Sequence, residues 1–241
     1  MIDHNALVGR WPFRDLGEWG TIAHLRSVAR ELALEEVWTS SLDATFHCET
    51  HSANHALQDQ IANDPVLRFV PAVFPDSPDA VSELAGLHRQ ESFRAVRLLP
   101  PLPGFEQHGE TRRLTLQWLD ANGCVAIVPL RVQDDRTRHP GFRCPTWDIV
   151  EVLALARNQA KLKFLLCGIR GSDIADHGDS LRALPNTFCD NSLLDSVPGT
   201  DRAVECLGAS RLVCGTNYPV FYPLAAVLKC RWGGLDADLR A

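Results

Sequence analysis

The most polar cluster at the end of any apolar segment lies at residues 131–140. Arg131 lies at the end of the apolar run Cys124–Val132, and Asp134, Asp135 and His139 follow it closely. A guanidinium can direct two hydrogen bonds onto a carboxylate or phosphate, and a carboxylate raises the pKa of a neighbouring imidazole. We therefore expect catalytic roles for Arg131, Asp134 and His139, with Asp135 as the alternative acid beside His139. A solvated loop of compensating charges is the competing interpretation.

Three histidines, His47, His51 and His55, are spaced four residues apart. On a helix they would share one face and could bind a divalent ion, with Cys48 or Glu49 assisting. The glutamate of an H-E-x-x-H motif is missing, so the pattern favours a polar helix start with His55 pointing outward. His47 and His51 stay candidates for the lining of a substrate pocket.

A buried charge is expected at Arg97, in the middle of the apolar segment Phe93–Leu99. A guanidinium inside a protein requires an acidic or amide partner, and Asn5, Asp190 and Asn217 are plausible ones. Arg97 is therefore either part of a structural ion pair or a substrate-binding group. Further candidates for contact with a substrate stand near the ends of apolar segments: Asn191, Ser192 and Tyr218, with Phe221 and Tyr222 as an apolar lip. These aromatic side chains could equally pack on the last helix.

Strand-like segments alternate with helical ones along the whole chain. The expected strands are Ile2–Val8, Glu36–Ser41, Leu67–Phe74, Phe93–Leu99, Cys124–Val132, Leu162–Cys167, Thr187–Asn191 and Arg211–Gly215. Between them, apolar residues recur at three- and four-residue spacing, as in Ile22–Leu34, Ser52–Asn63 and Trp147–Asn158. This alternation predicts parallel strands buried on both faces, and hence one (β/α)8 barrel domain over residues 1–241. Chemistry in such a barrel takes place at the C-terminal ends of the strands, where the candidates above stand.

Composition limits the class of protein. The 241 residues are close to the ~250 typical of one such barrel. A net charge of −6 with scattered basic residues argues against a nucleic-acid partner, and no apolar run approaches the ~18 residues of a membrane span. The start of the chain lacks a signal-peptide layout, and the cysteines include no C-x-x-C pair, which is typical of reduced thiols. We expect a cytoplasmic protein with a small-molecule ligand; a homodimer stays open, with Trp11, Trp19 and Trp232 as interface anchors or core residues.

The last expected strand and the turn after it resemble a segment of the amidohydrolase-related family (the amidohydrolase 2 group). Arg211-Leu-Val-Cys-Gly-Thr-Asn-Tyr-Pro219 is similar to that family's R-L-[LIV]-x-G-[ST]-D-x-P. Asp3–Arg14 resembles its opening D-x-H-x-H-x-G-x-W-P-F, Phe93–Pro101 its F-x-G-V-[KR]-L-x-P, and Pro185–Asp190 its P-N-V-Y-x-D. Four segments in the family's order imply its fold, a TIM barrel of the metal-dependent hydrolase superfamily.

The resemblance also implies where the family's metal ligands would stand. The paired histidines of its first strand correspond to Asn5 and Leu7, and the aspartate that ligates the metal and activates water corresponds to Asn217. A histidine at the end of the sixth strand is missing from Leu165–Arg170. Because asparagine is a poor zinc ligand and leucine is none, we expect the usual divalent metal (zinc) to be absent. His4 stands one residue off, and the strand period of two predicts that it faces the helices.

Two hypotheses follow. The first is an amidohydrolase-like hydrolase that acts on a small, carboxylate-bearing substrate, with a degenerate metal site or a metal relocated to His47 and His51. A carboxy-lyase of the same superfamily is a variant of this hypothesis. The second is a catalytically inactive barrel that binds a ligand, and a barrel mouth packed shut by Leu7 and phenylalanine side chains would favour it.

Overall fold

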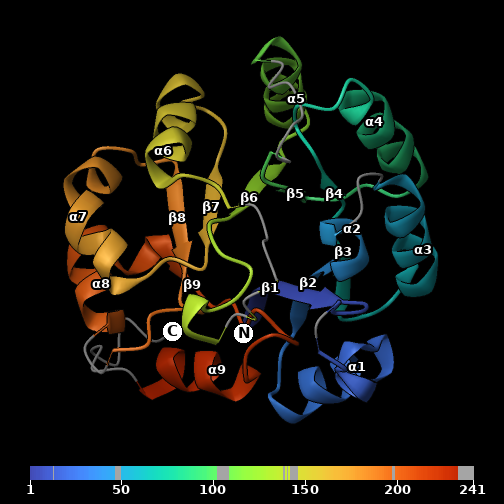
Figure 1. Cartoon of the computed structure of the whole chain (residues 1–241), viewed down its shortest axis with the longest axis horizontal. Coiled ribbons are helices and arrows are strands. Elements are labelled where there is room, and N and C mark those ends of the chain that lie inside the picture. Colours follow the sequence, from blue (N-terminus) through green and yellow to red (C-terminus); the bar gives the residue numbers. More distant parts are fainter. Residues whose placement is uncertain are drawn as a thin grey trace.

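Figure 1 shows the computed structural model of the chain, with the strands in the middle and the helices around them. The structure describes residues 1–12, 14–46, 50–101, 109–137, 139, 141, 146–196 and 199–232. The strands are β1 (Ile2–Val8), β2 (Glu36–Ser41), β3 (Leu67–Phe69), β4 (Ala72–Val73), β5 (Ala95–Leu98), β6 (Val125–Pro129), β7 (Phe164–Cys167), β8 (Thr187–Asp190) and β9 (Leu212–Val213). The α-helices are α1 (Ile22–Glu31), α2 (Leu42–Phe46), α3 (His51–Ile61), α4 (Ala80–Gln90), α5 (Gly109–Ala121), α6 (Ile149–Asn158), α7 (Gly171–Arg182), α8 (Gly199–Leu207) and α9 (Pro223–Trp232). Short 3-10 turns stand at η1 (Gly17–Gly20), η2 (Asp135–Thr137) and η3 (Ala209–Arg211).

The strands form a closed parallel barrel, as the sequence predicts. Hydrogen bonding gives the order β1-β2-β3 in one sheet and β4-β5-β6-β7-β8-β9 in the other. The chain from β3 to β4 joins the two sheets, because Val70 N donates to Thr39 O over 2.9 Å and Arg97 N donates to Pro71 O over 2.8 Å. At the other side, His4 N donates to Cys214 O over 2.9 Å and Asn217 N donates to Asn5 O over 2.7 Å, which closes the ring. With β3 and β4 counted as one strand, the architecture is a (β/α)8 barrel.

Two apolar layers hold the barrel together. Val96 and Val128 face outward and join the layer between the strands and the helices, together with Leu84 of α4. Their chain neighbours Ala95 and Ile127 face inward and pack in a separate cluster inside the barrel. Adjacent residues of one strand therefore serve different layers, which is why the strand sequences are almost continuously apolar.

A bulge in β1 decides which side chains face the barrel interior. Its register with β2 runs from Asp3↔Val37 to Ala6↔Thr39, so three steps on β1 oppose two on β2. The spare N–H of Asn5 donates to Asp3 Oδ1 over 3.0 Å. The prediction that His4 faces the helices is therefore wrong.

The ring of His4 lies inside the barrel, 4.8 Å from the ring of Trp38. Trp38 itself packs on the inward cluster of Ala95 and Ile127. The extra residue moves His4 to the inner face, because a bulge shifts the alternation of the strand by one position.

Within the described residues, no helix combines the length and the apolar character that a membrane crossing requires.

Candidate functional site at the C-terminal mouth of the barrel

Arg97 lies at the centre of a buried polar network inside the barrel. Its side chain projects inward from β5, and the residue is 2 % exposed. Nη2 donates to Asn5 Oδ1 over 2.8 Å, and Nε donates to Ser40 Oγ over 3.0 Å. Asn5 is thus a direct partner of Arg97, whereas Asp190 is reached through Asn5, whose Nδ2 donates to Asp190 Oδ2 over 2.8 Å.

Asp190, at the end of β8, accepts hydrogen bonds from several donors. Its Oδ1 accepts from Gly168 N over 2.9 Å and from Ser192 Oγ over 3.0 Å. Burial raises the pKa of Asp190, and the hydrogen bonds from Gly168, Asn5 and Ser192 offset part of that rise. Gly215 is necessary here, because a Cβ at that position would stand 2.6 Å from Asp190 Oδ2. The glycine of the G-T-N-Y-P segment therefore makes room for this carboxylate.

A second buried carboxylate, Asp3, ties β1 to the turn after β9. Its Oδ1 accepts from Thr216 N over 2.9 Å and its Oδ2 accepts from Thr216 Oγ1 over 2.6 Å. Burial raises the pKa of Asp3 and lowers the pKa of the Arg97 guanidinium, while Asp190 and Asp3 act on Arg97 in the opposite direction. Within the described residues, the interior thus holds Arg97 near Asp3 and Asp190, and these side chains are fixed by specific hydrogen bonds.

An apolar cluster lies next to this network, one inward position further along β1. Leu7 is 2 % exposed and stands opposite Ser40 in the register of β1 and β2. It packs with Trp11, Leu42 and Val132, and the ring of Trp11 meets the ring of Phe46 edge to face at 5.2 Å. Trp11 is therefore a buried core residue here. The part of the mouth that the structure describes is polar around Arg97 and apolar around Leu7.

Asn217 has a structural contact in the position where a metal-ligating aspartate was expected from the resemblance. Its Nδ2 donates to Val132 O over 2.9 Å, and the residue is 3 % exposed. Its backbone is in the left-handed region, with φ of 50°, which asparagine tolerates better than most residues. This hydrogen bond fastens the turn after β9 to the loop after β6.

Asn191 and Tyr218 do not join Arg97. Asn191 Nδ2 donates to Ala226 O over 2.9 Å, and its Oδ1 accepts from Gly215 N over 3.1 Å, so this side chain connects the turn after β9 to α9. Tyr218 is fully buried, and its hydroxyl lies 2.9 Å from Nδ1 of His24 on α1. Of the candidates for contact with a substrate, the structure thus groups Asn5 and Arg97 and turns Asn191 and Tyr218 toward the helices.

The charges of the loop after β6 are compensated by the next two loops. Arg131 forms a bidentate contact with Asp173 at the start of α7, with Nη1–Oδ2 at 2.6 Å and Nη2–Oδ1 at 3.0 Å. Asp134 accepts from Arg136 Nε over 2.8 Å and from Arg170 Nη2 over 3.3 Å. Arg136 lowers the pKa of Asp134, and this cause outweighs the desolvation that acts against it. Arg131 and Asp134 therefore occupy a network of ion pairs beside the mouth.

His139 and the histidines of α3 lie farther from the network. His139 is exposed, and its Nδ1 accepts from Gly141 N over 3.1 Å; its pairing with Asp134 or Asp135 stays a prediction. His51 starts α3, and its ring stands 4.3 Å from that of His55, one helical turn away as expected. His47 lies outside the described residues. Within the described part of the chain, no group of three His, Cys, Asp or Glu side chains could hold a metal ion.

Several residues of the site were not singled out from the sequence. Asp3 is a charge inside an apolar strand, so the reasoning that flagged Arg97 applies to it equally. Asp173 and Arg170 stand directly after an apolar segment, and Asp173 Oδ2 caps the start of α7 by accepting from Arg170 N over 2.8 Å. Ser40 carries no signal that distinguishes it from other strand serines.

Comparison with known proteins places this barrel among related folds. A family model described as amidohydrolase matches residues 11–230. The 2,6-dihydroxybenzoate decarboxylase from Rhizobium is 13 % identical, with a TM-score of 0.73 over 99 % of this chain and 93 % of that one. The 5-carboxyvanillate decarboxylase from Sphingomonas paucimobilis is 13 % identical, with a TM-score of 0.71 over 92 % and 80 % of the two chains.

A probable 2-pyrone-4,6-dicarboxylic acid hydrolase from Acinetobacter baumannii is also similar in structure. It is 13 % identical, with a TM-score of 0.66 over 99 % of this chain and 94 % of that one. At identities this low, these likenesses show a shared fold. No curated protein matches the sequence.

Proposed function

This chain belongs to the amidohydrolase family, and we propose that it binds a small carboxylate on Arg97, at the C-terminal mouth of the barrel. The observation that carries the proposal is the incomplete pairing of this guanidinium. Nε and Nη2 donate to Ser40 and Asn5, whereas Nη1 has no acceptor within the described residues. Nη1 is not among the fully buried side-chain atoms that lack a partner, so it is open to water or to a ligand, and a carboxylate oxygen is a suitable acceptor for it.

The residues at the family's metal positions do not fit a divalent ion. Asn5 uses its oxygen to accept from Arg97 and its nitrogen to donate to Asp190. Leu7 has no donor atom, and Asn217 presents its amide N–H to Val132 O. A metal at these positions would have to displace three established contacts and gain only weak ligands. The proposed binding therefore relies on the fixed charge of Arg97.

The surroundings of Arg97 suit an acid with an apolar body. The cluster of Leu7, Trp11, Leu42 and Val132 lies beside Ser40, a partner of Arg97. The similar structures are named for enzymes of aromatic or ring-bearing carboxylic acids, which supports a ligand of the same kind. A ligand whose carboxylate binds Arg97 and whose ring packs on these apolar side chains would contact both the polar and the apolar part of the mouth.

The test is a binding experiment with a matched pair of ligands. 2,6-Dihydroxybenzoate and resorcinol differ by one carboxylate, and isothermal titration should show binding of the acid and little binding of resorcinol. Arg97→Met should weaken binding of the acid about 10-fold or more, whereas Arg97→Lys, which keeps the charge, should retain part of it. Circular dichroism of each variant checks that the barrel is folded. Equal affinity of wild type and a folded Arg97→Met for the acid would refute the proposal.

Turnover of the same carboxylate, by hydrolysis or by loss of carbon dioxide, is a second candidate. It is favoured by the contact between Asn217 and Val132, which brings the loop of Arg131 and Asp134 to the rim of the mouth. Assays of ester and lactone hydrolysis and of carbon dioxide release, with and without added zinc or manganese, test it. Activity that disappears in His139→Ala and Arg131→Ala would support this candidate, and no activity above these variants in any condition would reject it.

A further inference from the structure

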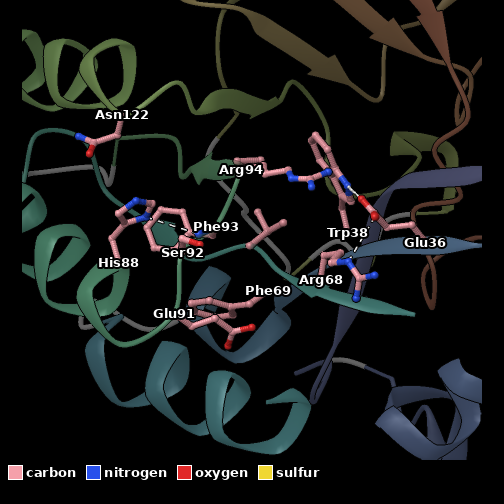
Figure 2. Close-up of a pocket in the computed structure, with 12 residues that line it drawn as sticks. Glu36, Trp38, Arg68, Phe69, His88, Glu91, Ser92, Phe93, Arg94 and Asn122 are labelled. Atoms are coloured by element: carbon pink, nitrogen blue, oxygen red, sulfur yellow. Dashed lines mark hydrogen bonds and ion pairs between the residues drawn. The ribbon is translucent and has the colours of Figure 1, made fainter. Parts of the chain in front are cut away.

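A separate pocket opens at the other end of the barrel. It has a volume of about 370 Å³, and it is lined at the start of β2 by Glu36, at the start of β5 by Ala95 and along β3 by Phe69. All strands run in one direction, so the beginnings of the strands lie opposite the mouth that contains Asn217. Figure 2 shows this pocket, with His88 at the end of α4 on one side and Trp38 on the other.

The walls of this pocket are aromatic and held in place by their own contacts. Phe69 and Phe93 meet edge to face at 6.0 Å, and His88 stands 4.7 Å from Phe93. The indole of Trp38 is fixed by its Nε1, which donates to Glu36 Oε1 over 2.7 Å, and by the ring of His4 at 4.8 Å. A planar group that enters the pocket therefore meets surfaces that are already ordered.

Most charges around the pocket are neutralised within the protein. Glu36 accepts from Arg68 Nε over 3.2 Å as well as from Trp38. Arg68 in turn donates through Nη1 to Asp64 O over 2.8 Å and through Nη2 to Pro65 O over 3.0 Å. These two side chains hold the loop before β3 and have little capacity left for a ligand.

Arg94 differs from them. Within the described residues its guanidinium has no acceptor, and Figure 2 shows it extended across the pocket toward Trp38. His88 Nδ1 accepts from Phe93 N over 3.4 Å, which holds the imidazole against the wall of the pocket. The exposed carboxylate of Glu91 stands at the side of the pocket away from Arg94 (Figure 2).

We propose that this pocket binds a small planar carboxylate, with the acid on Arg94 and the ring between Trp38 and the Phe69–Phe93 pair. A guanidinium fork matches a carboxylate, and an aromatic ring matches the ordered walls. A free phosphate would use the charge but leave the aromatic surface uncovered. The volume lies within the range of small-molecule sites, about 300–1,000 Å³. The site does not depend on ligand binding at Arg97.

The test is a titration of the full chain with benzoate and with benzyl alcohol as its neutral counterpart, followed by saturation-transfer NMR and tryptophan emission. Arg94→Gln should weaken binding of benzoate at this site about 10-fold or more. Arg89→Gln removes another exposed arginine nearby, on α4 and outside the pocket, and should leave the affinity unchanged.

Arg97→Met separates this site from the mouth. If the pocket binds benzoate, a folded Arg97→Met protein keeps a benzoate site that disappears when Arg94→Gln is added. If Arg97→Met alone removes all binding, or if Arg94→Gln changes nothing, the pocket does not bind carboxylates and the proposal is overturned. Equal binding of benzoate and benzyl alcohol would also overturn it, because the charge of Arg94 would then play no part.

Discussion

Asn217→Asp introduces the residue that the resemblance implies at this position and should destabilise this protein. The amide of Asn217 donates to Val132 O over 2.9 Å in a site that is 3 % exposed. An ionised aspartate has no proton to donate, so its oxygen would face the carbonyl oxygen of Val132. One unsatisfied buried acceptor costs about 1–3 kcal/mol, and the repulsion adds to it. At pH 7 we expect a loss of about 2–3 kcal/mol in the free energy of unfolding, or roughly 4–12 °C in Tm.

The pH dependence of this variant gives a second, independent readout. The repulsion and the burial raise the pKa of the new carboxyl in the folded state above its unfolded value of about 3.9. The protonated form can donate to Val132 O, so the lost stability should return as the pH falls below the raised folded pKa and should be complete below about 3.9. Asn217→Ala, which removes the same hydrogen bond without adding a charge, should show no such recovery.

Thermal unfolding of the wild type and both variants between pH 4 and pH 8, with and without zinc, measures these effects. If Asn217→Asp is as stable as the wild type at pH 7, the hydrogen bond to Val132 is not the role of this residue. If zinc raises the Tm of Asn217→Asp well above that of the metal-free variant, the barrel has kept a metal site in spite of Asn5 and Leu7.

Two further changes test the interior of the barrel. Gly215→Ala should lower the Tm by several degrees, because its Cβ would stand 2.6 Å from Asp190 Oδ2. Gly109→Ala should not, because no atom of the described residues lies within 4 Å of its added Cβ, and thermal unfolding compares the two. His4→Gln should flatten the acid side of the stability curve. Burial lowers the pKa of His4 from its model-peptide value of 6.5, so the stability it contributes is present above pH 6.5 and is lost as the pH falls through the folded pKa. Urea unfolding from pH 7.5 to pH 5 checks this, and equal slopes for wild type and His4→Gln would contradict it.

The barrel could be predicted from the sequence because the local patterns of its strands and helices agree with one another. The expected bounds of the first two strands coincide with β1 and β2, and the strand expected at Leu67–Phe74 contains β3 and β4. A buried arginine needs a hydrogen-bond acceptor, and Asn5 accepts from Arg97, as expected from the sequence. The requirement that a buried charge has a polar partner follows from the residue alone and does not depend on the details of the fold.

The remaining features depend on geometry that residue patterns do not encode. A bulge adds one residue to β1 without changing its composition, so the side of the strand on which His4 lies could not be derived from a period of two. Arg131 stands at a strand end, as expected, but its partner Asp173 lies 42 residues away, and the sequence gives no reason to prefer that contact over a ligand. Tyr218 contacts His24, 194 residues away along the chain, and the sequence gives no reason to prefer that contact over a place in the barrel mouth.

We propose that Arg97, without a metal ion, holds the carboxylate of a ligand in the barrel mouth. The most direct measurement is a calorimetric titration of 2,6-dihydroxybenzoate into protein treated with a chelator, before and after addition of one equivalent of zinc, with the Arg94→Gln variant used to isolate the mouth. We predict the same affinity with and without zinc, and loss of binding when Arg97→Met is introduced. Binding that appears only after zinc is added, and that survives in Arg97→Met, would contradict the claim.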